Sequence, residues 1–105
     1  DQNEYFALKN YLNSANNGHV LSMLKAGALY KQNKDYDNAI YWYTCALNSK
    51  KDEAYAGLIE TYLDMGNIEV SKLEMLLNEI KNKDSDNYKI IKDKVQKYIE
   101  NRSEI

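Results

Sequence analysis

The residue types most often used for acid–base, nucleophilic or metal chemistry are scarce in this 105-residue chain. It holds one histidine, His19, and one cysteine, Cys45. A catalytic histidine needs an orienting acid and a nucleophile held near it, and the sequence suggests neither for His19. Cys45 falls between core positions of a helical pattern, which favours a structural thiol over a nucleophile. We expect no catalytic, cofactor-binding or metal-binding residues, and therefore no enzymatic activity.

Three carboxylates have a spacing that is suited to recognition. Glu53, Glu60 and Asp64 lie at positions i, i+7 and i+11, which places them on one face of a helix. Such a row favours a basic or amphipathic peptide as the partner. The alternative interpretation is that all three are ordinary solvated acids.

Composition and charge narrow the classes of partner and compartment. The net charge is −2, so nothing in the electrostatics favours nucleic acid. No apolar run approaches the length of about 18 residues that a membrane helix needs, and we expect no membrane insertion. A lone cysteine fits a cytoplasmic protein.

The chain begins without methionine, so it is expected to be a processed product or a segment of a longer protein, with any N-terminal signal removed.

The elements that must position these residues follow an internal repeat of 32 positions. Small residues match small ones and large residues match large ones, as in Ala7 and Ala39, Tyr11 and Tyr43, and Tyr30 and Tyr62. The same shift carries Ala39 to Ser71 and Tyr43 to Met75. It predicts that the helical stripe of the preceding unit resumes at Ile68, Ser71, Met75 and Leu76 to Asn78.

Within each unit the apolar residues recur at the helical spacing i, i+3, i+4 and i+7. Short polar turns separate these stripes, and proline is absent. The pattern predicts six helices, at about 3–16, 20–33, 36–49, 51–65, 68–82 and 86–101. Asp35 and Asn67 are expected to cap helix N-termini, and Ser49 with Asp52 to form a capping box.

The stretch "MLKAGALYKQNKDYDNAIYWYTCAL" resembles the tetratricopeptide repeat (TPR), in which large, small and tyrosine residues recur at fixed places. Met23, Gly27, Tyr30, Ala39 and Ala46 are among the residues that occupy those places. The segments "YWYTCAL" and "NSANNGHVLSMLKAG" also resemble the related Sel-type repeats. The repeat of 32 residues differs from the 34 that is usual for TPR.

The resemblance implies an all-α fold, an α–α superhelix forming a right-handed solenoid of about two and a half helix-turn-helix repeats with six helices. We expect a single TPR-like domain over residues 1–105. Its parts are the second helix of a partial repeat at 3–16, repeats at 20–49 and 51–82, and a capping helix at 86–101.

In such stacks the first helix of each pair lines a concave groove. Carried over residue by residue, the resemblance predicts that partner-binding residues are Leu21, Leu24, Ala28 and Lys31 from one unit and Glu53, Ala56, Glu60, Leu63 and Asp64 from the next. The implied function is a non-catalytic protein–protein interaction module or scaffold that binds a peptide or helix in this groove.

Two other functions fit the same residues. The chain could be a small dedicated chaperone or adaptor, for example of a secretion apparatus, or the regulatory domain of a larger enzyme. A stable array usually needs three or more units, so a homodimer or a longer repeat array is also compatible with the sequence.

Overall fold

Six α-helices form most of the residues that the computed structural model describes, which are residues 2–103. The helices are α1 (Gln2–Asn16), α2 (Val20–Gln32), α3 (Tyr36–Ala46), α4 (Asp52–Met65), α5 (Val70–Glu79) and α6 (Asp86–Ser103), with a short 3-10 turn, η1 (Leu47–Ser49), after α3. Over this range there is no β-strand. The all-α fold with six helices is confirmed.

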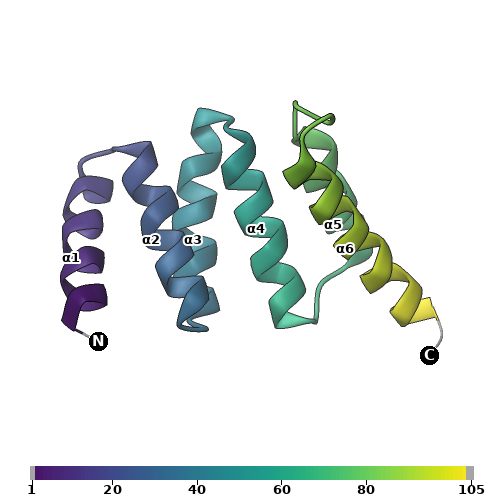
Figure 1. Cartoon of the computed structure of the whole chain (residues 1–105), viewed down its shortest axis with the longest axis horizontal. Helices are drawn as coiled ribbons and strands as arrows, with labels where there is room; N and C mark the ends of the chain where they lie inside the picture. Colours follow the sequence, from purple (N-terminus) through teal and green to yellow (C-terminus); the bar gives the residue numbers. More distant parts are fainter. Residues whose placement is uncertain (1, 104–105) are drawn as a thin grey trace.

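Helices that are neighbours in sequence are also neighbours in space. Helix α2 packs against α1 and α3, α3 packs against α4, and α4 packs against α5 and α6. Figure 1 shows the first four helices side by side along the long axis, with α5 and α6 together at the far end. The molecule is accordingly elongated, 43 × 28 × 21 Å. One core cluster lies between α1, α2 and α3, and a larger one joins α3 to α6.

The ring of Tyr43 joins three helices. Tyr43 lies on α3 and is 6% exposed. A Cβ atom on Gly27 of α2 would lie 3.1 Å from this ring, and a Cβ atom on Gly57 of α4 would overlap it. Because glycine has no Cβ, α2 and α4 can both approach the same ring closely.

Backbone turns recur at half the repeat length. Gly18, Lys34, Lys50 and Gly66, each 16 positions after the one before, have positive φ angles of 89°, 63°, 57° and 74°. This left-handed conformation ends a helix by turning the chain away from its axis. Because these turns lie 16 positions apart, the first four helices follow the 32-residue repeat.

The expectation that Ser71, Met75 and Asn78 face the core is wrong. All three are exposed, and Leu73 and Leu76 are the buried residues of α5. Helix α4 is one residue longer than α2, and the connection from α4 to α5 is one residue longer than the connection from α2 to α3. Helix α5 therefore begins 34 positions after α3, at Val70 rather than Ile68, and two extra residues rotate a helix face by about 200°.

Of the expected helix ends, the cap at Asp35 is confirmed and the others need correction. Asp35 does cap α3, since its carboxylate accepts a hydrogen bond from the Asn38 N–H at 3.4 Å. Asn67 is no cap, because α5 begins three residues later. The Ser49 and Asp52 capping box is absent: the Ser49 hydroxyl donates to the Ala46 carbonyl at 2.7 Å. The expected helix 36–49 ends as a 3-10 turn, and that at 68–82 spans only Val70–Glu79.

Two polar contacts attach connecting segments to distant helices. The Asp52 carboxylate, at the start of α4, accepts the N–H groups of Lys81 and Asn82 at 2.8 and 3.0 Å. The Lys81 N–H bond is the main reason that the pKa of Asp52 is lowered. The Tyr98 hydroxyl of α6 donates to the Ile68 carbonyl at 2.9 Å and accepts the Ile68 N–H at 3.1 Å. These bonds fix the segments that enter and leave α5.

Substitution of Gly57 by alanine tests the close packing around Tyr43. The new Cβ must displace the ring, so we expect a loss of about 1–3 kcal/mol in unfolding free energy, although alanine gains about 1 kcal/mol of helix propensity. Gly27→Ala, with more room, should change stability by less than about 1 kcal/mol. Urea unfolding followed by Trp42 fluorescence measures both. Equal effects at the two glycines would contradict the packing described.

Substitution of Lys50 by glycine tests the strained turn. A side chain in the left-handed region costs roughly 1 kcal/mol, so Lys50→Gly should stabilise the fold by about 0.5–1 kcal/mol. Lys51→Gly is the matched control, because Lys51 has an extended backbone with φ −80° and ψ 138°. There glycine only adds freedom to the unfolded chain and should destabilise. Changes of the same sign at both positions in thermal unfolding would refute this account.

Candidate functional site

A hollow between α2 and α4 brings four of the predicted site residues together. Its cavity volume is about 270 Å³, and it is lined by Leu21, Leu24, Lys25, Ala28, Tyr43 and Glu53. Helix α2 supplies four of these residues at the spacing i, i+3, i+4 and i+7, which is one continuous helical face. We call this site the α2–α4 hollow.

The α2–α4 hollow combines an apolar lining with one base and one acid. Leu21 is 67% exposed, and Leu24 is half-buried and packs on the larger core cluster. The buried Tyr43 connects the lining to the interior. Lys25 and Glu53 are exposed and carry opposite charges. The site can therefore receive an apolar side chain and offer one polar contact of each sign beside it.

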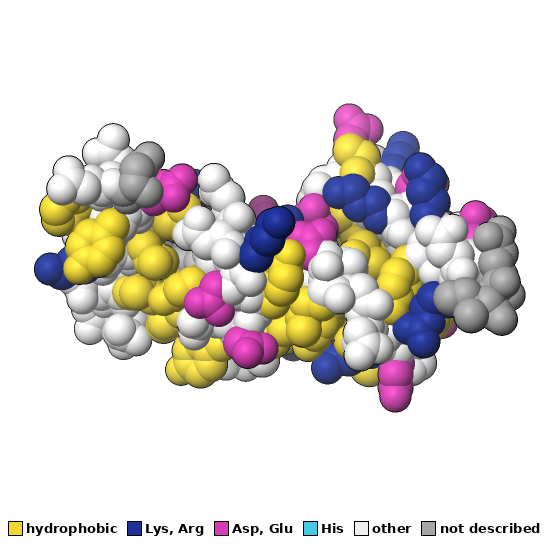
Figure 2. Space-filling model, turned by 90° about the horizontal axis from the view of Figure 1, so that it is seen from below, with side chains coloured by type: hydrophobic (Ala, Val, Ile, Leu, Met, Phe, Trp, Pro, Cys, Tyr) yellow, Lys and Arg dark blue, Asp and Glu magenta, His cyan; other side chains and the backbone are white. Residues whose placement is uncertain are grey.

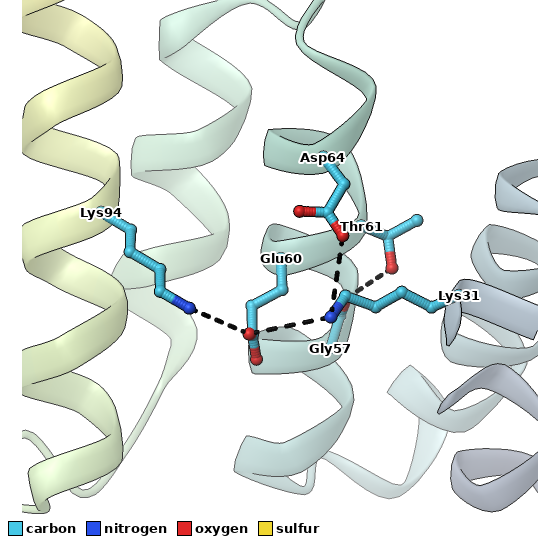
Figure 3. A network of polar contacts seen from close by, with 6 residues as sticks. All are labelled: Lys31, Gly57, Glu60, Thr61, Asp64 and Lys94. Carbon is cyan, nitrogen blue, oxygen red and sulfur yellow. Dashed lines mark hydrogen bonds and ion pairs between the residues drawn. The ribbon is translucent and has the colours of Figure 1, made fainter. Parts of the chain in front are cut away.

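Lys31, Glu60, Asp64 and Lys94 form an ion-pair network across α2, α4 and α6 (Figure 3). The Lys31 Nζ lies 3.9 Å from Glu60 Oε2 and 3.8 Å from Asp64 Oδ2, and the Lys94 Nζ lies 3.4 Å from Glu60 Oε2. Two lysines thus offset two of the three carboxylates predicted to form an acidic row. Glu60 and Asp64 do not present uncompensated negative charge to a partner.

The remaining predicted site residues lie elsewhere. Ala56 is 5% exposed, so the expectation that it lines a binding surface is wrong: the close approach of α4 to its neighbours leaves it almost no surface. Leu63 lines a different hollow of about 290 Å³ with Lys94, Lys97, Tyr98 and Asn101, between α4 and α6. The nine predicted residues therefore do not form one continuous groove.

Two lining residues were missing from the prediction. Lys25 follows Leu24 on α2 and shares its helical face, a signal that the sequence did contain. Tyr43 was assigned to the core alone, yet it also borders the hollow. Tyr43 is only 6% exposed, because the backbones of Gly27 and Gly57 pack closely on its ring.

Burial, followed by the charge of Glu60, raises the pKa of Tyr43 to about 12. His19 is exposed and Cys45 half-buried. Over residues 2–103 no three His, Cys, Asp or Glu side chains gather in a way that could hold a metal ion. Across the same residues, no helix has both the length and the apolar character to cross a bilayer.

Comparison with known proteins adds no family assignment. The chain matches no family profile, no curated protein and no solved structure. The resemblance to the tetratricopeptide repeat thus stays a prediction that is based on the residue pattern.

Alkaline unfolding tests the environment of Tyr43. Its folded-state pKa of about 12 lies above the ordinary value of 10.0, so the stability that it contributes is complete below pH 10 and is lost as the pH rises toward 12. The wild type should lose stability over this range more steeply than Tyr43→Phe in urea unfolding. Tyr41→Phe, which removes the hydroxyl of an exposed tyrosine on the same helix, should follow the wild type. Parallel curves for wild type and Tyr43→Phe would exclude the raised pKa.

Proposed function

We propose that this chain is a non-catalytic protein-interaction module that binds an amphipathic helix or peptide segment in the α2–α4 hollow. The observation that carries the proposal is the exposure of Leu21, 67%, at the edge of a hollow whose lining includes Leu24, Ala28 and Tyr43. A large apolar side chain held in water beside an apolar depression is typical of an interaction site.

The partner is defined by its pattern of apolar residues more than by its net charge. An apolar side chain of the partner enters the hollow, and its flanking polar groups meet Lys25 and Glu53. Glu60 and Asp64 are already paired with Lys31, so they add little attraction for a basic peptide. Helices that bind grooves present anchors at i, i+3 or i+4, and i+7. The small hollow suits a weak, reversible contact.

The repeat architecture supports this proposal. The pairwise packing of successive helices is compatible with a right-handed α-solenoid of TPR-like units. In addition, the buried residues of α3 and α5 are related by 34 positions, from Ala39 to Leu73 and from Trp42 to Leu76, and 34 residues is the usual length of a TPR unit. Arrays of this kind bind extended segments and helices along one face.

Selection of helical peptides from a display library on the purified chain tests the site. Peptides chosen by the wild type should bind Leu21→Asp at least about 10-fold more weakly, because a carboxylate replaces the apolar edge of the hollow. Met75→Asp is the matched control, since Met75 is similarly exposed but lies on α5, and it should bind as the wild type does. Circular dichroism verifies that both variants fold.

Peptides that bind Leu21→Asp as tightly as the wild type would exclude the α2–α4 hollow. Peptides that lose affinity for Met75→Asp instead would place the binding surface on α5.

A further inference from the structure

Two charges of opposite sign border the α2–α4 hollow on its two walls. Lys25 lies on the α2 wall and Glu53 on the α4 wall, and both side chains are exposed. Within residues 2–103 neither of them makes an ion pair. Each can therefore pair with a charge that a partner brings to the hollow, without first giving up a contact inside the chain.

The same groove is already bridged farther along. Lys31 lies seven positions after Leu24 on one face of α2, and Glu60 and Asp64 lie 7 and 11 positions after Glu53 on one face of α4. The Lys31 ammonium group contacts both acids, at 3.9 and 3.8 Å, and so joins the two walls. The charges of the groove are thus paired at this bridge and unpaired at the hollow, where a partner can use them.

The surface as a whole does not select a partner by charge of one sign. Figure 2 shows acidic and basic side chains interspersed over the face of the molecule that is seen from below, and the net charge of the chain is −2. Long-range attraction of a charged partner is accordingly weak. Discrimination by charge must come from the groups at the site, and these are Lys25 and Glu53.

The two walls of the groove run in the same direction (Figure 1). Contacts between them pass along both helices in one sense, from Leu21 and Glu53 at the hollow to Lys31 and Glu60 at the bridge. A partner helix that lies between the walls points one residue, i, into the hollow. At 100° per residue, its positions i−3, i+1 and i+4 lie on one flank and i−4, i−1 and i+3 on the other. One flank then faces Lys25 and the other faces Glu53.

An extended segment cannot meet both charges in this way. Its successive side chains point to opposite faces, so the neighbours of an anchor residue in the hollow point away from both walls. The placement of one charge on each side of an apolar depression therefore favours a helix as the partner.

We infer that the partner of the α2–α4 hollow is an amphipathic helix whose apolar anchor lies between an acidic flank and a basic flank. The acidic flank pairs with Lys25 and the basic flank with Glu53. Turning the helix end for end exchanges its flanks, which sets like charges against each other and weakens binding. The two wall charges thus fix the direction in which the helix lies. This inference rests on the proposed function, which it makes more specific.

Charge reversal on the walls tests the inference with peptides whose binding depends on Leu21. These peptides should carry opposite charges on the two flanks of the anchor. Lys25→Glu and Glu53→Lys should each weaken their binding about 3- to 10-fold, because an attraction becomes a repulsion. Lys92→Glu is the matched control, since it reverses an exposed lysine on α6, and it should bind as the wild type does. Calorimetric titration measures the affinities, and circular dichroism verifies that each variant folds.

The double variant Lys25→Glu with Glu53→Lys tests the direction of binding. It should regain the wild-type affinity to within about threefold, with the peptide lying the opposite way. A spin label at the N-terminus of the peptide reports the direction, because it broadens amide NMR signals near Val20 at one end of α2 or near Gln32 at the other. The broadened signals should move from one end to the other between the wild type and the double variant.

Peptides whose affinity depends on Leu21 but is unchanged by Lys25→Glu and Glu53→Lys would overturn this inference and leave the proposed function standing. Broadening at the same end of α2 in the wild type and the double variant would also overturn it. A library that yields no binder dependent on Leu21 would overturn the inference and the proposed function together.

Discussion

The Tyr43 ring fills the space between α2 and α4 at two positions where neither helix has a side chain, Gly27 and Gly57. This contact sets how closely the first helices of the two units approach each other. The separation in turn allows the Lys31 ammonium group to reach both Glu60 and Asp64. The buried hydroxyl of Thr61, one turn beyond Gly57, donates to the Gly57 carbonyl at 2.7 Å (Figure 3). The packing around one ring thus determines the floor of the α2–α4 hollow and the charge balance beside it.

The two halves of the molecule are held together by different means. Between α1 and α4 the connections are short turns at regular spacing, and the stability comes from small residues and aromatic rings packed between helices. Around α5 the connections are longer and are held by side chains that are distant in sequence, Asp52 and Tyr98. Those hydrogen bonds attach the two segments that flank α5 to α4 and α6.

The sequence allowed the number of helices, their approximate ends and the grouping of Leu21, Leu24, Ala28 and Glu53 to be predicted, because helical periodicity is a local signal. It did not reveal which face of α5 is buried. One extra residue in α4 and one in the connection after it lengthen the spacing from α3 to α5 to 34 positions, and the composition gives no sign of this change. Nor did it reveal the ion pairs of Glu60 and Asp64 or the burial of Ala56. These depend on the distance between helices that are some thirty residues apart in the chain, which periodicity does not encode.

The half-repeat spacing of the left-handed turns has a consequence for how the chain can change in length. Since Gly18, Lys34, Lys50 and Gly66 turn the backbone in the same sense at equal intervals, duplication of any 32-residue stretch between them would add a helical hairpin whose two junctions already match. Beyond Gly66 the interval changes, and a duplicated stretch would meet a junction of the wrong length. We therefore expect duplication or deletion of a 32-residue stretch to preserve the helix junctions on the amino-terminal side of Gly66 and to disrupt them on the carboxy-terminal side.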